Sequence, residues 1–196
     1  MIVGLTGGIG SGKSTVAKMF SEFKKIAIYI ADDEAKKLMN TSVEIKKQLV
    51  SEFGEKTYIE DKLNRPYLAA IVFKDKKKLT ILNSIVHPVV NNHFQNFIKQ
   101  NTDKDYILYE NAILFENKND FFCDKIITVT APLEIRINRV VKRDNSTKEE
   151  VLNRIKNQCS ETKKTLQSNY IIENITLTKT KEQVLKIHNY LTKGFA

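Results

Sequence analysis

Residues 7–14 read Gly-Gly-Ile-Gly-Ser-Gly-Lys-Ser and follow a short apolar run, Ile2–Leu5, at the N-terminus. This is the phosphate-binding loop (P-loop) pattern G-x-x-x-x-G-K-[ST] in the setting that it requires: a strand, a glycine-rich turn and a helix. The glycines let successive backbone N–H groups turn inward around phosphate oxygens, because no Cβ atom blocks them. The dipole of the following helix adds positive potential at the same place. The motif therefore predicts an α/β fold whose first strand leads into a nucleoside triphosphate site.

Each position of this loop has an expected role. Lys13 is a mobile charge that can reach the β- and γ-phosphates, and the Ser14 hydroxyl can hold Mg²⁺. Contacts to the nucleotide are expected along the loop, at Gly8, Ile9, Gly10, Ser11, Gly12, Lys13, Ser14 and Thr15. The alternative is a chance match in a glycine-rich turn, which explains poorly an eight-residue motif at the first strand–helix junction.

The composition is that of one globular domain, or of one domain with a modest insertion. The chain has 196 residues and an apolar content of 41%, which is enough for a core. Met1 leads directly into a strand, so we expect no signal peptide, and no apolar run approaches transmembrane length. Cys123 and Cys159 have no metal-type or redox-type spacing, so we expect reduced thiols in a cytoplasmic protein.

The net charge of +9 is the one bulk property that would suggest binding to nucleic acid. However, the lysines are scattered along the chain, and polyphosphate ligands explain a basic protein without any polymer. We therefore expect small-molecule partners, no nucleic acid, no membrane, and a monomer or a weak homo-oligomer.

Short apolar segments alternate with helical patterns along the chain. The expected strands are Ile2–Leu5, Ile26–Ile30, Tyr106–Tyr109, Ile126–Val129 and Tyr170–Ile172. Because helical stretches separate them, these segments predict a five-stranded parallel sheet with helices on both faces.

The interval Asp33–Gln100 differs, because it contains amphipathic helical segments and no convincing strand. Pro66 stands where a first helical turn would begin, and Pro88 predicts a break or kink in a later helical series. A helical insertion between two strands of a nucleotide-binding sheet usually carries the second substrate, so we expect that role here.

Two helices with arginines near their junction are predicted after Ala131-Pro132. Offsets of three and seven residues nearly superpose on a helix, which brings three arginines onto one face: Arg136, Arg139 and Arg143. A capping box, Thr147-x-x-Glu150, predicts the start of the second helix. This arrangement is typical of a lid that senses phosphate. The alternative is a solvated basic face in which Glu150 and Arg154 form an ordinary i,i+4 pair.

Asp32, at the carboxyl end of the second expected strand, is the candidate for the chemistry. In an open α/β sheet that end faces the phosphate site. A carboxylate there can accept the proton of an attacking hydroxyl, or orient Mg²⁺, during γ-phosphoryl transfer. The alternative is that Asp32 or Asp33 caps a helix that begins near Glu34.

Together these residues resemble the dephospho-CoA kinase family. The segment Gly4–Ser14 is similar to the family's N-terminus, and Ala31-Asp32 with Ala35 resembles the later part of its Asp-Ala-Asp-x-x-Ala signature. Further similar segments follow in order, with compatible spacing: Leu63-Asn64-Arg65 with Leu68 and Phe73, His87-Pro88, residues 113–116 (Ile-Leu-Phe-Glu), Arg139, residues 142–144 (Lys-Arg-Asp), Arg154 with Gln158, and residues 170–174 (Tyr-Ile-Ile-Glu-Asn). The P-loop occurs in many families, whereas its combination with Ala-Asp, His-Pro and Leu-Phe-Glu is much more specific.

Four positions depart from the family pattern. Ile30 replaces the first Asp of Asp-Ala-Asp, and Asn169 replaces an Asp before the last strand. Glu110 and Ala112 replace the Asp and the Pro of an Asp-Val-Pro element. Glu110 keeps a carboxylate with a longer reach, so the division of magnesium binding between Asp32 and Glu110 stays open.

The resemblance implies an ATP- and Mg²⁺-dependent phosphorylation of the ribose 3′-hydroxyl of dephospho-coenzyme A, the last step of coenzyme A biosynthesis. It implies one kinase domain, 1–196, in three parts: a nucleotide-binding core (1–32, 101–138 and 160–196), a helical CoA-binding insertion (33–100) and a lid (139–159). The implied catalytic residues are Asp32, as base or hydroxyl-orienting group, with Lys13, Arg139 and Arg143 at the transferring phosphoryl group. Arg65 and His87 are implied at the acceptor site, and Asn174 near the adenine.

Plainer roles exist for some of these residues. Arg65, just before Pro66, is also explained as a solvated residue at a helix start, and His87 as a structural histidine with satisfied hydrogen bonds. Glu116 is a surface residue or a support for the site, and we assign it no chemistry.

Two other functions compete with this interpretation. Asn117-Lys118-Asn119-Asp120 spells the N-K-x-D string that binds guanine in GTP-binding switches. Such a switch also needs a D-x-x-G sequence to sense the γ-phosphate, and none lies between the P-loop and Asn117. A different small-substrate kinase fits the composition equally well, and only the Ala-Asp, His-Pro and Leu-Phe-Glu set argues against it.

Overall fold

The computed structural model describes residues 1–193, which form two compact units. The first unit contains Met1–Ile30 and the chain from Asn101 onward, and the second contains Ala31–Gln100. Residues 194–196, the end of the core expected over 160–196, lie outside the described residues. No helix in the described part of the chain is long and apolar enough to cross a membrane.

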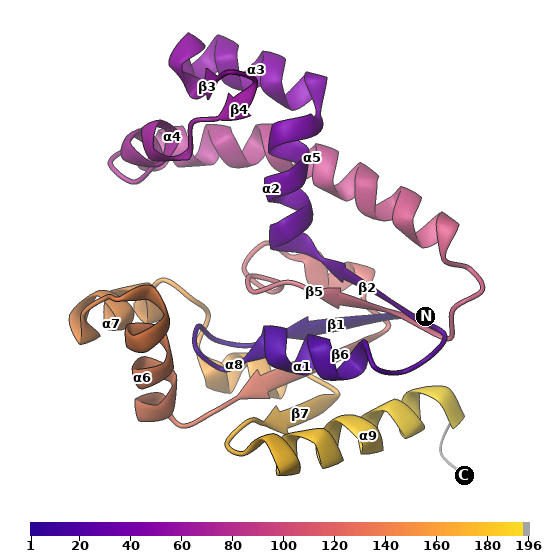
Figure 1. The fold of residues 1–196 in the computed structure, drawn as a ribbon. Coiled ribbons are helices and arrows are strands. Elements are labelled where there is room, and N and C mark those ends of the chain that lie inside the picture. Colours follow the sequence, from indigo (N-terminus) through magenta and orange to yellow (C-terminus); the bar gives the residue numbers. More distant parts are fainter. Residues whose placement is uncertain (194–196) are drawn as a thin grey trace. The chain divides into compact units, whose positions relative to one another are not determined.

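The first unit is built on a five-stranded parallel sheet of order β2-β5-β1-β6-β7 (Figure 1). Its strands are β1 (Ile2–Thr6), β2 (Ile26–Ile30), β5 (Tyr106–Glu110), β6 (Lys125–Thr130) and β7 (Tyr170–Glu173). The inner strands are almost continuously buried, as expected for parallel strands that are covered on both faces. All five expected strands and the parallel sheet are confirmed.

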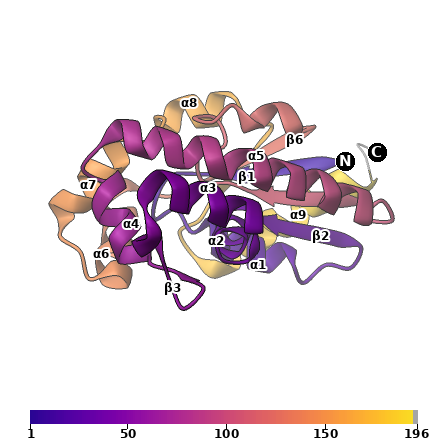
Figure 2. The same ribbon diagram turned by 90° about the horizontal axis from the view of Figure 1, so that it is seen from above.

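Helices cover both faces of this sheet. The first unit contains α1 (Lys13–Phe20), the 3₁₀ turn η2 (Asn119–Phe122), α6 (Leu133–Asp144), α7 (Lys148–Lys156), α8 (Glu161–Leu166) and α9 (Leu177–Lys193). Helices α1 and α9 pack together on one face, and α8 lies on the other (Figures 1 and 2). The main core includes Leu5 of β1, Phe20 of α1 and Val184 of α9, all at most 1% exposed.

The capping box predicted for α7 is formed. The Thr147 side chain accepts a hydrogen bond from the Glu150 N–H, and the Glu150 carboxylate accepts one from the Thr147 N–H. Asn145 ends α6 in the left-handed conformation, so a tight turn joins α6 to α7.

The second unit is mainly helical, as expected. It contains α2 (Ala31–Thr41), α3 (Val43–Phe53), the 3₁₀ turn η1 (Glu55–Thr57), β3 (Tyr58–Ile59), β4 (Lys62–Leu63), α4 (Arg65–Val72) and α5 (Lys76–Gln100). The long helix α5 packs against α2, α3 and α4. Pro66 lies in the first turn of α4 as predicted, where its missing N–H costs no hydrogen bond.

One expectation for this interval is wrong. It contains a small hairpin, β3–β4, whose turn residues Glu60 and Asp61 both have positive φ. Of the break or kink expected at Pro88, the break does not occur, because α5 continues through the proline. Side chains on both sides of the proline, Val86 and Val90, are buried in the core of the unit, and their burial outweighs the roughly 3 kcal/mol that an interior proline costs.

Helix α2 also begins earlier than expected. It starts at Ala31, directly after β2, rather than near Glu34. Asp32 and Asp33 therefore lie inside the first helical turn instead of at a capping position before it. Carboxylates in a first turn interact favourably with the helix dipole.

Candidate active site

The P-loop of the first unit is held closely from two sides. Gly12 precedes α1 with φ 90° and ψ 31°, a left-handed conformation that favours glycine. A Cβ atom on Gly12 would lie 2.1 Å from the Asn174 amide nitrogen, and a Cβ on Gly8 would lie 2.3 Å from Arg136 Nη2. A side chain at position 12 would need a left-handed backbone and a displacement of Asn174, whereas one at position 8 would have to displace the guanidinium group of Arg136.

A cavity of about 320 Å³ opens at the N-terminus of α1. Backbone and side chains of the loop, α1 and α6 line it: Gly10, Gly12, Lys13, Ser14, Thr15, Arg139, Val140 and Arg143. The first amides of a helix have no partner within that helix, and the helix dipole adds positive potential. With one lysine and two arginines at its wall, the cavity fits a polyphosphate.

The three positively charged side chains at this cavity form hydrogen bonds with different partners. Lys13 Nζ donates to the Gly7 carbonyl at 2.9 Å. Arg139 Nη2 donates to the Asn174 carbonyl at 3.0 Å, and its Nη1 lies 3.5 Å from the Ser11 carbonyl. Arg143 is mostly exposed and forms a two-pronged contact with the neighbouring Asp144, at 2.6 and 3.0 Å.

Asp144 joins the two helices of the expected lid at their junction. Besides Arg143 of α6, it accepts a hydrogen bond from Arg154 of α7 at 2.8 Å. The hydrogen bond from Arg143, supported by Arg154, lowers the pKa of Asp144 to about 2. Arg154 thus pairs with Asp144, while Glu150 serves as the cap of α7.

Asn174, expected near the adenine, is joined to the P-loop. Its Nδ2 donates to the Ser11 carbonyl at 2.8 Å, and its Oδ1 accepts from the Thr180 hydroxyl at 3.0 Å. The residue is only 3% exposed. The structure therefore brings together the P-loop, Arg139 and Asn174, which are far apart in the sequence.

Two further residues that we did not predict as site residues contact the P-loop. Arg136 is buried and donates from Nε to the Ile9 carbonyl at 3.0 Å and from Nη1 to Glu161 at 2.6 Å. Gln158 Oε1 accepts the Ile9 N–H at 2.8 Å. A second cavity, of about 430 Å³, lies beside these groups and reaches Gly8. The sequence contained two signals for these residues: the helical spacing of Arg136 with Arg139 and Arg143, and the resemblance of Gln158 to the family pattern.

Glu116 forms an ion pair with a buried lysine. It lies 2.9 Å from the ammonium group of Lys164, a fully buried side chain that also donates to the Ala112 carbonyl at 3.1 Å. Glu116 accepts the Cys159 N–H at 2.7 Å as well. Burial raises the pKa of Glu116, but the Cys159 N–H and Lys164 outweigh that effect and hold the pKa below its usual value.

Two of the positions that depart from the family pattern lie at strand ends. Glu110 is 4% exposed at the carboxyl end of β5, in register with Leu5 of β1 and Ile30 of β2. Asn169 accepts the Ile126 N–H through Oδ1 at 2.8 Å, where β6 begins. The amide at position 169 therefore has a structural role next to the sheet.

The three residues expected to contact the acceptor belong to the second unit. Asp32 lies in the first turn of α2, Arg65 is the first residue of α4, and His87 lies within α5. Burial lowers the pKa of His87, which favours a neutral imidazole at neutral pH.

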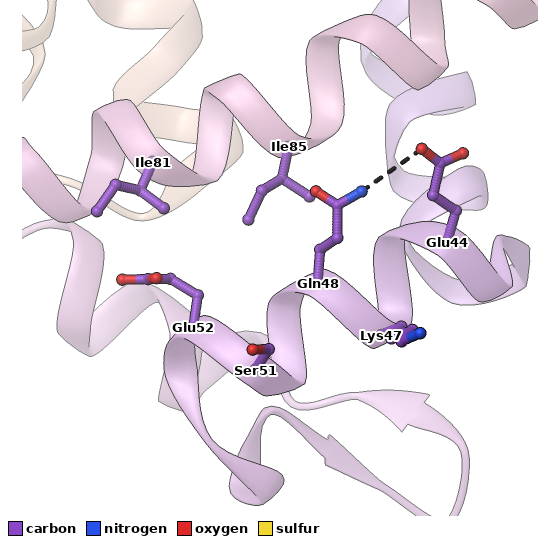
Figure 3. A pocket seen from close by; sticks show the side chains of 7 residues that line it. All are labelled: Glu44, Lys47, Gln48, Ser51, Glu52, Ile81 and Ile85. Carbon is purple, nitrogen blue, oxygen red and sulfur yellow. Dashed lines mark hydrogen bonds between the residues drawn. The ribbon is translucent and has the colours of Figure 1, made fainter.

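A groove of about 610 Å³ lies between α3 and α5 of this unit (Figure 3). Ile81 and Ile85 of α5 form its apolar side. On the other side, Gln48 donates a hydrogen bond to Glu44, and both of these residues belong to α3. None of the three expected acceptor residues lines it.

Comparison with known proteins gives one consistent result. The family model described as dephospho-CoA kinase matches residues 1–179. A dephospho-CoA kinase from Fusobacterium nucleatum is 40% identical over 177 residues, which are 89% of this chain and 89% of that protein. One from Bacteroides fragilis is 38% identical over 172 residues, 88% of this chain and 83% of its own.

Solved structures agree in fold. A crystal structure of a Thermus thermophilus protein superposes with a TM-score of 0.85 at 30% identity, covering 100% of this chain and 98% of that one. The dephospho-CoA kinase from Campylobacter jejuni gives a TM-score of 0.73 at 24% identity, with 98% of each chain covered. At that identity the second likeness concerns the fold alone.

Proposed function

The chain belongs to the dephospho-CoA kinase family, and from that premise we propose that it transfers the γ-phosphoryl group of ATP to the ribose 3′-hydroxyl of dephospho-coenzyme A. The observation that carries the proposal is the basic cavity at the P-loop, where Arg139 and Asn174 meet the loop. Membership of this family also argues against the GTP-binding switch that Asn117-Lys118-Asn119-Asp120 suggested.

ATP would be held by the P-loop and the start of α1. Amides of the loop and Lys13 bind the β- and γ-phosphates in this proposal, and the exposed Ser14 hydroxyl would hold Mg²⁺ together with phosphate oxygens. When bound, Mg²⁺ supplies positive charge that neutralises the phosphates. Asn174 and Arg139 would border the nucleotide on the side of the β7–α9 loop.

Asp32 would act as the base or as the group that orients the acceptor hydroxyl. The acceptor O–H bond breaks, its proton passes to the Asp32 carboxylate, and the ribose oxygen forms a bond to the γ-phosphorus. The bond between the γ-phosphorus and the β–γ bridging oxygen breaks, and ADP leaves. Two features support this role: Asp32 follows β2 by only two residues, and the carboxyl ends of parallel strands are where such sheets bind ligands.

Arg139 and Arg143 would neutralise charge on the transferring phosphoryl group. Arg139 lies at the cavity wall with its guanidinium fixed by backbone carbonyls. Arg143 would exchange its contact with Asp144 for one with the phosphoryl group. Both the carboxylate and the phosphoryl group offer two oxygen atoms to the two N–H groups of the guanidinium. The helix pair α6–α7 serves as the lid in this scheme.

The helical unit would bind dephospho-coenzyme A. Arg65 at the start of α4 is suited to a phosphate of the acceptor, and His87, neutral because of burial, to a hydrogen bond. We propose small molecules as the partners, with no nucleic acid or membrane, in a cytoplasmic protein that is a monomer or a weak homo-oligomer. The lysines support this view, since they are scattered over the whole chain and their longest run is three residues, Lys76–Lys78.

The test of the catalytic assignment compares two neighbouring aspartates. Asp32→Asn keeps the size of the side chain but removes the base, so kcat should fall by about 10²–10⁴ while the Kd for ATP changes little. Asp33→Asn is the matched control, because Asp33 is exposed and forms its ion pair with Lys36 of the same helix. Equal kcat values for wild type and Asp32→Asn would mean that Asp32 is not the base.

A further inference from the structure

Ile9, in the P-loop, contacts α6 and the segment after α7 through both of its backbone polar groups. Its N–H is accepted by Gln158 Oε1 at 2.8 Å, and its carbonyl accepts from Arg136 Nε at 3.0 Å. Arg136 belongs to α6, whereas Gln158 lies just beyond the end of α7. The two hydrogen bonds therefore connect one residue of the loop to both ends of the helix pair.

The Ile9 side chain adds a third, apolar contact to the same helices. It packs against a small cluster whose buried members are Ile137, Val140 and Val151. These residues come from α6 and α7, which lie side by side (Figure 1). The cluster is separate from the core of the sheet, so Ile9 is a member of the lid's own core.

Hydrogen bonds to residues outside the P-loop also hold Arg136 and the segment that carries Gln158. Arg136 is held by Glu161, the first residue of α8, at 2.6 Å. The residue after Gln158, Cys159, donates its N–H to Glu116 at 2.7 Å, and Glu116 is paired with the buried Lys164. The segment between α7 and α8 thus has a defined position from which Gln158 reaches the loop.

We propose that the backbone of Ile9 couples α6–α7 to the P-loop, and that Gln158 is a positioning residue for the triphosphate. A displacement of α7 that withdraws Gln158 leaves the Ile9 N–H without its acceptor, so the Gly8–Ile9 peptide is held only through the Gly8 carbonyl, which accepts the Ser11 N–H at 3.1 Å, and can rotate more easily. Rotation of this peptide redirects the amides that follow it in the loop, where phosphate binds. The proposal deepens the proposed function and rests on it only in requiring that the P-loop bind a triphosphate.

The test uses Gln158→Met, which keeps the length of the side chain and removes the acceptor. The probes are ATP and inorganic tripolyphosphate, whose Kd values are measured by calorimetry, and hydrogen exchange of the Ile9 amide, measured by NMR. Loss of one hydrogen bond should raise both Kd values about three- to tenfold and speed exchange of the Ile9 amide by a similar factor. Gln158→Glu retains an acceptor oxygen and should keep the slow exchange of that amide.

A chemically matched control separates positioning from general destabilisation. Gln183 on α9 makes the same kind of bond, accepting the Glu173 N–H at 2.9 Å, and it donates to the carbonyls of Glu173 and Lys179, so its hydrogen bonds join β7 and α9. Gln183→Met should lower Tm at least as much as Gln158→Met and leave Ile9 exchange unchanged. Identical Ile9 exchange and tripolyphosphate affinity in wild type and Gln158→Met would overturn the coupling. A wild-type protein that binds neither ATP nor tripolyphosphate would instead overturn the proposed function.

Discussion

The close approach of Asn174 to the P-loop predicts a specific energetic coupling with Gly12. Alanine at position 12 would have to adopt φ 90°, and its Cβ would lie 2.1 Å from Asn174 Nδ2. The amide group must then move and give up its 2.8 Å hydrogen bond to the Ser11 carbonyl. Gly12→Ala therefore has two separable effects, one on the backbone and one on Asn174.

The magnitude follows from these two effects. The left-handed conformation costs an alanine about 1–2 kcal/mol, and the lost hydrogen bond about 0.5–1.5 kcal/mol. The free energy of unfolding should thus fall by about 1.5–3.5 kcal/mol, which for a chain of this size lowers Tm by about 3–14 °C. In an Asn174→Ala background the hydrogen bond is already gone, so Gly12→Ala should cost only the backbone strain. The double variant should be more stable than the sum of the single effects predicts, by about 0.5–1.5 kcal/mol.

The assay is thermal unfolding of wild type, both single variants and the double variant, followed by circular dichroism. Gly54→Ala is the control, because Gly54 also has a positive φ, 88°, but the nearest atom to an added Cβ is 3.8 Å away. Its effect should add to that of Asn174→Ala. If Gly12→Ala and Asn174→Ala were additive within about 0.3 kcal/mol, the contact between the two residues would be refuted.

Three further predictions concern buried ionisable groups. Lys164→Met leaves the Glu116 carboxylate without its ammonium partner, so the free energy of unfolding, measured in urea, should fall by about 3 kcal/mol. The double variant Lys164→Met/Glu116→Gln removes the unpaired charge and should regain most of that stability. Burial raises the pKa of the Cys123 thiol to about 12. In a Cys159→Ser variant, where Cys123 is the remaining thiol, iodoacetamide should therefore label it slowly at neutral pH, and the labelling rate should still rise above pH 9.0. Burial lowers the pKa of His188 below its usual 6.5, so the folded state favours the neutral ring; stability should be full above pH 6.5 and decline as pH falls through that value. His188→Phe should flatten the acid side of the Tm–pH profile, and an unchanged slope would show that another group titrates there.

The parts of the fold that could be predicted are those encoded in a few consecutive residues. The strand–loop–helix of the P-loop and the capping box at Thr147 each depend on neighbours within about one helical turn. The β3–β4 hairpin was missed because its turn residues, Glu60 and Asp61, have positive φ without the glycine or asparagine that usually marks such a turn. Helix α2 was expected too late because no separate capping residue stands between it and β2.

The supporting residues of the site could not be predicted for a different reason. Arg136 and Lys164 occur in helical segments rich in charge, where a solvated side chain is the ordinary expectation. Their burial depends on partners that are 127 and 52 positions away, Ile9 and Ala112. Only the packing of α6 and α8 on the rest of the first unit brings these groups together, and no local pattern encodes it.

The central claim is tested most directly by ADP formation from ATP and Mg²⁺, with and without dephospho-coenzyme A, and with GTP as the control nucleotide. Phosphorus NMR of the product locates the transferred group. We expect ADP to form only when the acceptor is present, with one phosphate on the ribose 3′-oxygen for each ADP released. Nucleotide hydrolysis that ignores the acceptor, or that prefers GTP, would contradict it.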